Sequence, residues 1–291
     1  MKKVSIAVIG GSGVYGFEGL DAVEEVRMQT PFGPTSDAIL IGRLGERQVA
    51  FLSRHGRGHP YNPSQVPYRA NIWALKKLGV FWCVSVSAVG SLRREIEPEH
   101  FVIPDQLIDR TRSRADTFFD ELAVHVGFAQ PFEPGLRQLL LAACRAEGVT
   151  VHDGGTYVCM EGPLFSTKAE SEMHRSWGAS LIGMTALPEA KLAREAEMAY
   201  ATIALATDYD CWHDEVVTVE MVVKHLQNNA ANVQRVLKRL IPSIPLGLEH
   251  ENSASRALEN AIMTAPALIP EKSWEAFGDW LEPRIGPRPF R

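Results

Sequence analysis

Along most of the chain, short apolar runs alternate with amphipathic segments, which is the pattern of stacked βα units. The apolar runs predict strands at 4–9, 38–41, 49–53, 82–86, 101–103, 157–159, 180–183 and 201–206. The amphipathic segments predict helices at 68–78, 135–147, 168–177, 188–198 and 219–240. We therefore expect an α/β fold.

Local signals support two of the helix starts. Thr167 and Glu170 form a capping box before the helix 168–177, and Pro188 occupies the first position of a helix, where its missing N–H costs nothing. In the long helix 219–240, Val and Leu residues repeat at helical spacing. We expect them to form one buried face.

The composition changes after residue 245. Residues 246–291 have a polar start, a helical stretch at 253–263, and an end with Pro and Trp residues. This segment is too small for a core of its own. We therefore expect a domain at 1–245 and a helical extension at 246–291, packed on that domain or on a neighbouring subunit.

The charge and cysteine content narrow the class of protein. The chain has 291 residues, 45% of them hydrophobic, and a net charge of −5 with acids and bases interspersed, so nothing indicates a nucleic-acid or anionic membrane surface. No segment has the pattern of a signal peptide or a membrane span. The four cysteines are scattered and indicate a reducing compartment. We expect a cytoplasmic protein with no nucleic-acid or membrane partner.

Two carboxylates follow the apolar run 201–206. Asp208 and Asp210 lie where ligands bind in open α/β sheets, beyond the carboxyl end of a strand. One carboxyl can stay protonated while the other accepts hydrogen bonds, which suits the N7 and 6-amino edge of a purine. The alternative is that the pair caps the next turn, since Asp favours such positions.

A glycine-rich loop follows the first predicted strand. Gly11, Gly13 and Gly16 have the spacing of a dinucleotide fingerprint. However, no long helix follows, and no second strand ends in an acid about 20 residues later. We favour a nest of backbone N–H groups, together with the Ser12 hydroxyl, that holds a small anion.

A basic turn follows the predicted strand 49–53. Arg54 offers a planar fork that matches two phosphate oxygens. His55 and His59 have a spacing that would suggest a metal site on a helix, but Gly56 and its neighbours exclude a helix there. We therefore predict no metal site.

Two further segments of small and hydroxyl-bearing residues follow predicted strands, at 87–92 and at 184–185. Their amides and hydroxyls can approach an oxyanion closely. Because strand ends gather at one edge of a sheet, we expect one phosphate-sized site that combines Arg54 with the hydroxyls of Ser12, Ser87 and Thr185.

Taken in order, these motifs resemble the trimeric purine nucleoside phosphorylases, and among them the branch that acts on 5′-methylthioadenosine. The resemblance covers about residues 3–242. It is carried by segments 10–13, 30–37, 54–56, 70–75, 90–92, 105–111, 161–163, 184–185, 188–189 and 207–212. It implies a single α/β domain with a mixed, partly barrel-like central sheet flanked by helices, assembled as a homotrimer.

The resemblance also implies roles for individual residues. Phosphate would be bound by Ser12, Arg54, His55, Ser87, Ala88 and Thr185. Purine and ribose would contact Ala88, Phe165 and Met184, with Asp208 and Asp210 facing the base. The 5′-methylthio group would lie among Val219, Val222 and Val223, and His125 would come from the adjacent subunit. The chain departs from the family at Ser12, where Thr is frequent, and at Leu164, where a basic residue is common.

The implied reaction is the phosphorolysis of 5′-methylthioadenosine to adenine and 5-methylthioribose 1-phosphate. Asp208 would protonate N7 of the leaving base, which is why a desolvated carboxyl suits the position. Asp210 would accept hydrogen bonds from a 6-amino group, and Ser166 would tune the same edge. Inorganic phosphate is then a co-substrate, and no cofactor or metal is required.

Several alternatives remain open. A phosphorylase of 6-oxopurine nucleosides or methylthioinosine would do better with an amide at position 210, and a hydrolytic nucleosidase would need no phosphate site. The hypothesis of a dinucleotide-dependent dehydrogenase rests on the glycine spacing alone. A non-catalytic nucleoside sensor would bind the same ligand without turnover. By pattern alone, the valines at 219–223 are core residues of the last helix.

Overall fold

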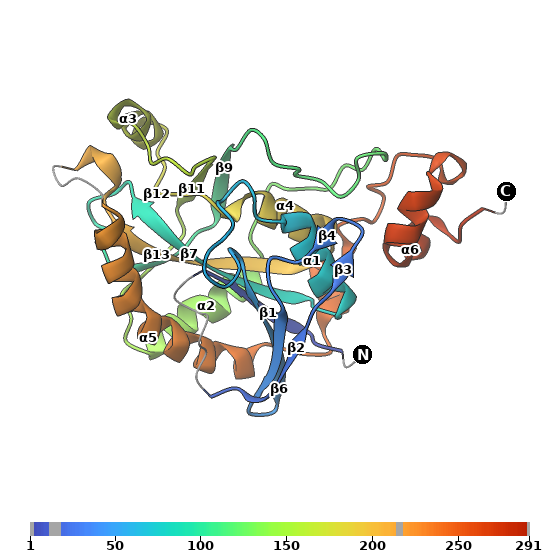
Figure 1. The fold of residues 1–291 in the computed structure, drawn as a ribbon, viewed down its shortest axis with the longest axis horizontal. Coiled ribbons are helices and arrows are strands. Elements are labelled where there is room, and N and C mark those ends of the chain that lie inside the picture. Colours follow the sequence, from blue (N-terminus) through green and yellow to red (C-terminus); the bar gives the residue numbers. More distant parts are fainter. Residues whose placement is uncertain (1–2, 12–18, 214–217, 290–291) are drawn as a thin grey trace.

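The computed structural model describes residues 3–11, 19–213 and 218–289 (Figure 1). The described strands are β1 (Ile6–Gly10), β2 (Asp21–Val26), β3 (Gln29–Thr30), β4 (Gly33–Pro34), β5 (Ile39–Leu44), β6 (Arg47–Ser53), β7 (Trp82–Ser91), β8 (Phe101–Ile103), β9 (Gln106–Arg110), β10 (Val151–Asp153), β11 (Thr156–Met160), β12 (Leu181–Gly183) and β13 (Ala199–Asp208). All but β3 and β4 belong to one mixed sheet of 11 strands.

The sheet divides at its central strand, β7. The main path runs β10-β8-β13-β7-β1-β6-β5-β2, and a branch leaves β7 through β12 to β11 and β9. Parallel β1 pairs with β7 from Trp82 to Ser85, whereas antiparallel β12 pairs with it at Gly90 and Ser91. The two partners therefore leave a gap along β7, and the branching gives the sheet its partly barrel-like form.

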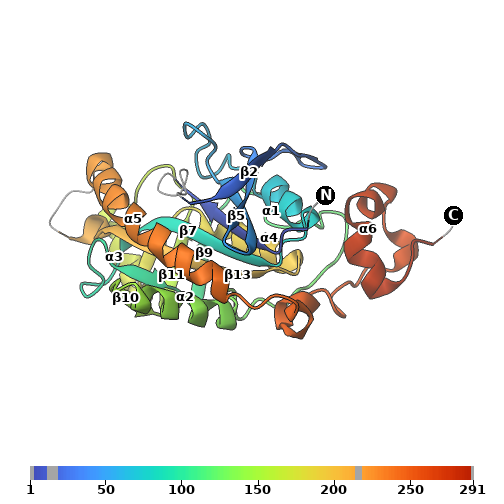
Figure 2. The same cartoon turned by 90° about the horizontal axis from the view of Figure 1, so that it is seen from below.

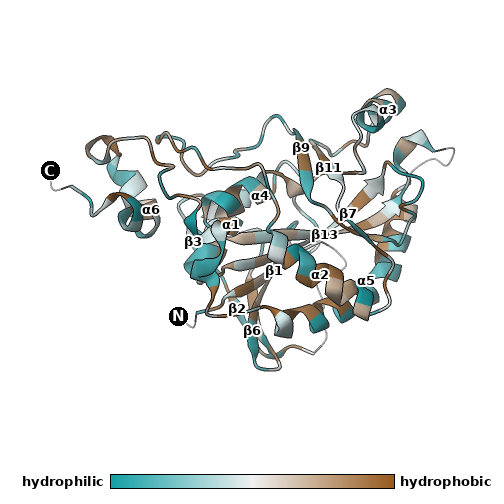
Figure 3. Cartoon of the chain, turned by 180° about the vertical axis from the view of Figure 1, so that it is seen from behind, coloured by the Kyte–Doolittle hydropathy of each residue, from teal (hydrophilic) through white to brown (hydrophobic). Residues whose placement is uncertain are grey.

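Helices cover both faces of the sheet. The described helices are α1 (Tyr68–Lys77), α2 (Pro134–Ala146), α3 (Lys168–Ser176), α4 (Ala186–Glu195), α5 (Val219–Ser243) and α6 (Glu271–Ile285), of which α1, α2, α4 and α5 cover the sheet. One core cluster contains buried residues of α1 and α4, and a second contains those of α2 and α5. Figure 2 shows α1 and α2 on opposite sides of the sheet. Figure 3 shows both hydrophobic and hydrophilic residues along α2 and α5, as expected of helices with one buried side. None of the described helices is long and apolar enough to cross a membrane.

Both predicted helix starts are present. The Thr167 side chain accepts a hydrogen bond from the Glu170 N–H, and the Glu170 carboxylate accepts one from the Thr167 N–H, so the capping box is formed. The assigned helix α4 starts at Ala186, but Leu187 is extended, so helical backbone begins at Pro188 as expected. The prediction that this helix reaches residue 198 is wrong, because it ends at Glu195 and β13 starts four residues later.

Two expectations about element boundaries are wrong. Residues 87–91, expected beyond a strand, belong to β7, because pairing with β13 and β12 continues the strand to Ser91. The helix α5 does not have one buried face throughout. Its buried residues begin at Asn229, and Val219 and Val223 are 64% and 44% exposed.

The tail differs from its prediction in its secondary structure. Instead of a helix at 253–263 there is a short 3-10 helix, η3 (Ser253–Arg256), followed by turns. Tertiary contacts replace the helical hydrogen bonds there. The Leu258 N–H donates to Glu197, the His125 N–H donates to the Ala261 carbonyl, and the Met263 N–H donates to Ala123.

The helix α6 was not predicted, and it packs on the rest of the same chain. Its Phe277 and Trp280 form edge contacts with Phe118 and Phe119. The indole N–H of Trp73 donates to the Ala276 carbonyl at 3.1 Å, and Arg284 forms a salt bridge of 2.8 Å with Glu197. Two shorter turns, η2 (Glu249–Glu251) and η4 (Pro266–Leu268), complete the tail. The proposed division at 245/246, and any contact of the tail with a neighbour, stay predictions.

We predict that Phe277→Ala lowers the free energy of unfolding by about 3–5 kcal/mol, because it removes a buried ring from an aromatic cluster. The measurement is denaturant unfolding followed by fluorescence. Leu268→Ala is the control, since that side chain is 74% exposed and its loss should change stability by no more than about 0.5 kcal/mol. Equal effects of the two changes would show that α6 does not stabilise the fold.

Candidate active site

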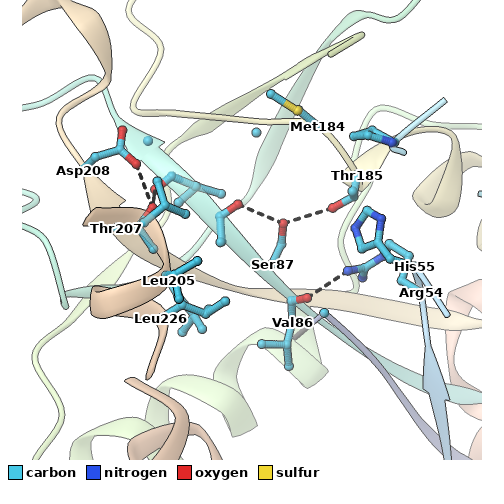
Figure 4. Close-up of a pocket in the computed structure, with 18 of the residues that line it drawn as sticks. Arg54, His55, Val86, Ser87, Met184, Thr185, Leu205, Thr207, Asp208 and Leu226 are labelled. Carbon is cyan, nitrogen blue, oxygen red and sulfur yellow. Dashed lines mark hydrogen bonds between the residues drawn. The ribbon is translucent and has the colours of Figure 1, made fainter. Parts of the chain in front are cut away.

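A cavity of about 450 Å³ lies where β1, β6, β7 and β13 reach their carboxyl ends and α5 begins (Figure 4). This volume suits a small-molecule ligand. Residues from six elements and their loops line it: Gly11, Arg54, His55, His59, Pro63, Val86, Ser87, Ala88, Val89, Gly90, Ile182, Gly183, Met184, Thr185, Leu205, Thr207, Asp208, Val219, Val222, Val223, Leu226, Ala230 and Val233. The motifs singled out in the sequence thus converge on one cavity.

The gap along β7 supplies the floor of the cavity. Neither β1 nor β12 pairs with Val86–Val89, so this edge of the strand has no ladder partner among the described residues. The Val86 carbonyl accepts from Arg54 on this side. Residues two apart on a strand present their backbone groups to the same edge. The Ala88 N–H therefore faces the gap and is available to an anion.

Three hydroxyls gather beside this edge. The Ser87 Oγ lies 3.1 Å from the Thr185 Oγ1 and 3.3 Å from the phenolic oxygen of Tyr157. Burial raises the pKa of Tyr157 above its ordinary range, so the phenol keeps its proton. A Cβ at Gly183 would lie 2.1 Å from the Tyr157 oxygen, so only glycine leaves room for the ring. The cluster can donate several hydrogen bonds to one anion.

Arg54 is buried and largely occupied by the protein itself. Its Nε and Nη2 donate to the two carboxylate oxygens of Glu189 at 2.7 and 2.9 Å. The Nη2 also donates to the Ser85 hydroxyl at 2.7 Å, and Nη1 donates to the Val86 carbonyl at 3.0 Å. Burial acts to lower the pKa of Arg54, but the Glu189 carboxylate outweighs it and holds that pKa above the ordinary value. The guanidinium expected to bind phosphate in a bidentate manner therefore binds Glu189 in this way. One Nη1 hydrogen remains available for a ligand.

The position of His55 determines which of its nitrogens carries a proton. Its Nδ1 lies 2.9 Å from the Tyr61 carbonyl, and because a carbonyl only accepts, Nδ1 is the donor. Burial, and then the charge of Arg54, lower the pKa of His55 to about 4. The ring is thus neutral at physiological pH and retains an acceptor at Nε2. It stacks on His59, with ring centroids 4.2 Å apart.

Asp208 ends β13 and faces the cavity. Its Oδ2 accepts from the Thr207 hydroxyl at 2.7 Å, and its Oδ1 accepts from the Asp210 N–H at 2.8 Å. Burial raises the pKa of Asp208, although these hydrogen bonds act in the opposite direction. A Cβ at Gly90 would lie 2.9 Å from its Oδ1, so the carboxyl depends on glycine there for its place.

Asp210 stands behind Asp208 rather than in the cavity. It begins a short turn, η1 (Asp210–Trp212), with a positive φ of 48°, and it is only 4% exposed. Its Oδ2 is buried without a hydrogen-bond partner among the described residues. This is a free acceptor that lies next to the cavity but does not line it.

The first half of α5 forms an apolar wall of the cavity. Val219, Val222 and Val223 line it, followed by Leu226 and Ala230 one and two turns later. The exposed fractions of Val219 and Val223 exclude the reading of these valines as core residues.

Other predicted site residues lie outside the cavity. Phe165 is 47% exposed, on the loop between β11 and α3, next to Leu164, which is 82% exposed. The Ser166 hydroxyl lies 3.9 Å from the Met160 sulfur. His125 is exposed beside the tail, and Ser12 lies outside the described residues. Within one chain, Phe165, Ser166 and His125 therefore do not line the cavity.

The sequence assigned no role to Tyr157, Glu189 and Gly183, and it placed Gly90 only in a segment of small residues expected beside an oxyanion. Glu189 was part of a quoted motif, and its full burial beside Arg54 and Tyr200 is what shows its role. Tyr157 lies in an apolar run, so its pattern predicts core only. Gly183 carries no signal except the absence of a side chain, and the motif that contains Gly90 does not show its contact with Asp208.

Two motifs were interpreted above as neither a dinucleotide site nor a metal site: the glycine-rich segment and the pair His55 and His59. After the glycine-rich segment the described chain resumes at Gly19 and enters β2, not a helix, which argues against a dinucleotide fold. Among the described residues, no group of three or more His, Cys, Asp or Glu side chains could hold a metal.

Residues 5–242 match the sequence profile of the Phosphorylase superfamily, and the chain belongs to this superfamily. It is 53% identical to the S-methyl-5′-thioadenosine phosphorylase of Synechocystis sp. (strain PCC 6803 / GT-S), over 94% of this chain and 86% of that protein.

Solved structures show the same similarity. A methylthioadenosine phosphorylase from an antarctic soil metagenomic library has a TM-score of 0.89 and 44% identity, covering 96% of this chain and 99% of that one. The S12T mutant of the Schistosoma mansoni adenosine/methylthioadenosine phosphorylase, in complex with methylthioadenosine, has a TM-score of 0.85 and 33% identity, covering 90% and 99%.

We predict that Gly90→Ala lowers the rate of the reaction implied by the family resemblance by about 10²-fold, because it displaces Asp208, the acid predicted from the sequence, by roughly 1 Å. The rate is measured at saturating substrate, with circular dichroism as the check on folding. Gly278→Ala is the matched control, since a Cβ there meets nothing within 4 Å. A Gly90→Ala protein with unchanged rate would contradict the close approach of these two residues.

Proposed function

We propose that this chain catalyses the phosphorolysis of 5′-methylthioadenosine, yielding adenine and 5-methylthioribose 1-phosphate. The observation that carries the proposal is one cavity that combines a hydroxyl and amide cluster, a buried carboxyl and an apolar wall. The names of the relatives and of the matched structures agree with this substrate.

Phosphate binds at the gap in β7. The Ala88 N–H and the hydroxyls of Ser87 and Thr185 donate to its oxygens, and Ser12 adds another hydroxyl. His55 accepts through Nε2 from a protonated phosphate oxygen, which a neutral ring can do and a charged ring cannot. Arg54 contributes its remaining hydrogen bond and positive charge. These contacts orient the nucleophile toward the ribosyl C1′.

Asp208 acts as the general acid. As the glycosidic bond breaks, negative charge develops on the purine, and a proton delivered to N7 neutralises it. The raised pKa of Asp208 favours the protonated form that this step needs. Met184 contacts the ribose, and phosphate serves as counter-charge to the cationic sugar.

Asp210 selects the base. Its unpartnered Oδ2 accepts a hydrogen bond from the 6-amino group of adenine and would repel a 6-oxo group. Since this carboxylate does not line the cavity, the contact requires a shift of η1 on ligand binding. Ser166 modifies the same edge, and Phe165 stacks on the purine when its loop covers the site.

The 5′-methylthio group lies against Val219, Val222 and Val223, since an apolar wall favours a thioether over a hydroxyl. The active assembly is a homotrimer in which His125 of each chain reaches the neighbouring site. Inorganic phosphate is the co-substrate, with no metal or cofactor. The four described cysteines are free thiols, in keeping with a cytoplasmic location.

We predict release of adenine from 5′-methylthioadenosine only when phosphate is present, with little release of hypoxanthine from 5′-methylthioinosine. Free purine is measured by chromatography for both nucleosides, with and without phosphate. Release without phosphate would mean a hydrolase, and a preference for the inosine compound would overturn the role of Asp210. Tight binding without turnover would favour the nucleoside sensor.

We predict that Asp208→Asn lowers turnover about 10²–10⁴-fold, the usual contribution of a positioned acid. The amide can keep the local hydrogen bonds, because Thr207 also donates to the Val89 carbonyl and can then accept from the new NH₂ group. The fold should survive, as measured by thermal unfolding.

The pH dependence of stability gives a second readout for the same variant. A raised folded pKa means that the native state loses stability as pH rises from the unfolded pKa, near 3.9, through the folded one. An Asn side chain does not ionise and so removes this loss. Above the raised pKa of Asp208, the variant should therefore be more stable than the parent protein by the amount lost, and below the unfolded pKa it should show no such gain. The opposite sign would show that Asp208 is ionised in the folded protein.

A further inference from the structure

A second cavity, of about 470 Å³, lies at the opposite end of the sheet from the candidate active site. It is bounded by the residues just before β1, by the end of α1 and the turn that leads to β7, and by the start of the tail. Its lining residues are Lys3, Ser5, Lys76, Gly79, Val80, Phe81, Leu246, Gly247 and Glu249. None of these lines the first cavity, so the two sites are separate.

Lys76, in the last turn of α1, is the unusual group in this cavity. Its side chain is partly buried, and among the described residues its Nζ has no hydrogen bond or ion pair. Its neighbour Lys77 pairs with Asp279, and Lys191 and Lys272 also have carboxylate partners. An amine held in a cavity without a partner is open to a reagent.

The charges around Lys76 leave it uncompensated. The nearby acid Glu197 is already taken by Arg284, at 2.8 and 2.9 Å, and by the Leu258 N–H. Arg284 and Lys3 repel its positive charge, and Glu249 is the carboxylate in the lining. Burial, assisted by these cations and opposed by Glu197, lowers the pKa of Lys76 to about 8. A substantial share of the amine is therefore neutral near physiological pH.

Lys3 lies close enough to take part. The Val4 N–H donates to the Leu78 carbonyl at 2.9 Å, which fixes the start of the chain beside the end of α1. The aliphatic part of Lys3 lies over Gly79, where a Cβ would come within 2.6 Å of it. The ammonium of Lys3 thus belongs to the same cavity as Lys76.

We propose that Lys76 is an acyl-acceptor site for small acyl phosphates. Its neutral amine attacks the carbonyl carbon of the donor and forms an amide bond. The bond between that carbon and the phosphate oxygen breaks, and the amine proton leaves with the released phosphate. Lys3 attracts the phosphate of the donor, and Val80, Phe81 and Leu246 accommodate a short acyl chain. The modification removes one positive charge from a group of three.

The test is acetylation by acetyl phosphate and, separately, by the uncharged donor acetic anhydride, with the modified lysines mapped by mass spectrometry. Lys168 and Lys272, both exposed, are the internal controls. We expect Lys76 to react at least about tenfold faster than either at pH 8 with both reagents, since an ordinary lysine is almost fully protonated there. Its rate should reach half its maximum near pH 8.

Lys3→Gln separates the reactivity of the amine from recognition of the donor. We expect it to lower the ratio of the acetyl phosphate rate to the anhydride rate at Lys76. If the anhydride modifies Lys76 no faster than the controls, the amine is not activated and the proposal is wrong. Fast reaction with anhydride alone, or an unchanged ratio in Lys3→Gln, would overturn acyl phosphates as the donor class.

Discussion

The buried ion pair of Arg54 with Glu189 is the interaction on which the site depends. Arg54 follows β6, Glu189 belongs to α4, and the pair also binds the Val86 carbonyl of β7 and the Tyr200 hydroxyl of β13. The ion pair thus joins three strands and a helix near the cavity. Breaking such a pair typically costs about 3–5 kcal/mol, because the remaining charge stays buried. Arg54, which the sequence predicts as a phosphate ligand, therefore acts mainly to hold the elements of the site together.

This ion pair explains how one edge of β7 can remain unpaired within the sheet. Between its contacts with β1 and β12, one edge of β7 has no strand partner from Val86 to Val89 among the described residues, while the other edge pairs with β13. Unpaired backbone groups are costly when buried, so they must find other partners. Arg54 satisfies the Val86 carbonyl, and we propose that phosphate satisfies the Ala88 N–H. The division of the sheet and the binding of an anion are then two aspects of one arrangement.

Much of the central architecture could be predicted from the sequence, because buried strands and amphipathic helices leave periodic patterns. The predicted segment 49–53 lies within β6 and ends with it, and the predicted segment 101–103 is β8. Edge strands such as β2 were missed, since Asp21–Val26 is mostly exposed and half of its residues are acidic, without a regular alternation. The prediction of a helix at 253–263 is wrong for a different reason. Hydrogen bonds to distant residues there replace the helical ones that the local pattern favours. Within the site, the strand ends were predictable, but the roles of Glu189 and Gly90 depend on spatial neighbours and leave no local pattern.

The two ends of the candidate active site differ in how they are built. The end that we propose for phosphate consists of a backbone edge and the buried hydroxyls of Ser87 and Thr185, which contact each other beside the core. The other end is the first half of α5, whose Val219 and Val223 line the cavity and stay 64% and 44% exposed. Natural variation can therefore change that helical wall at small cost to folding. Inhibitors that distinguish between related enzymes should consequently gain their selectivity from the substituent that reaches α5, and those built only on the anion end should bind them alike.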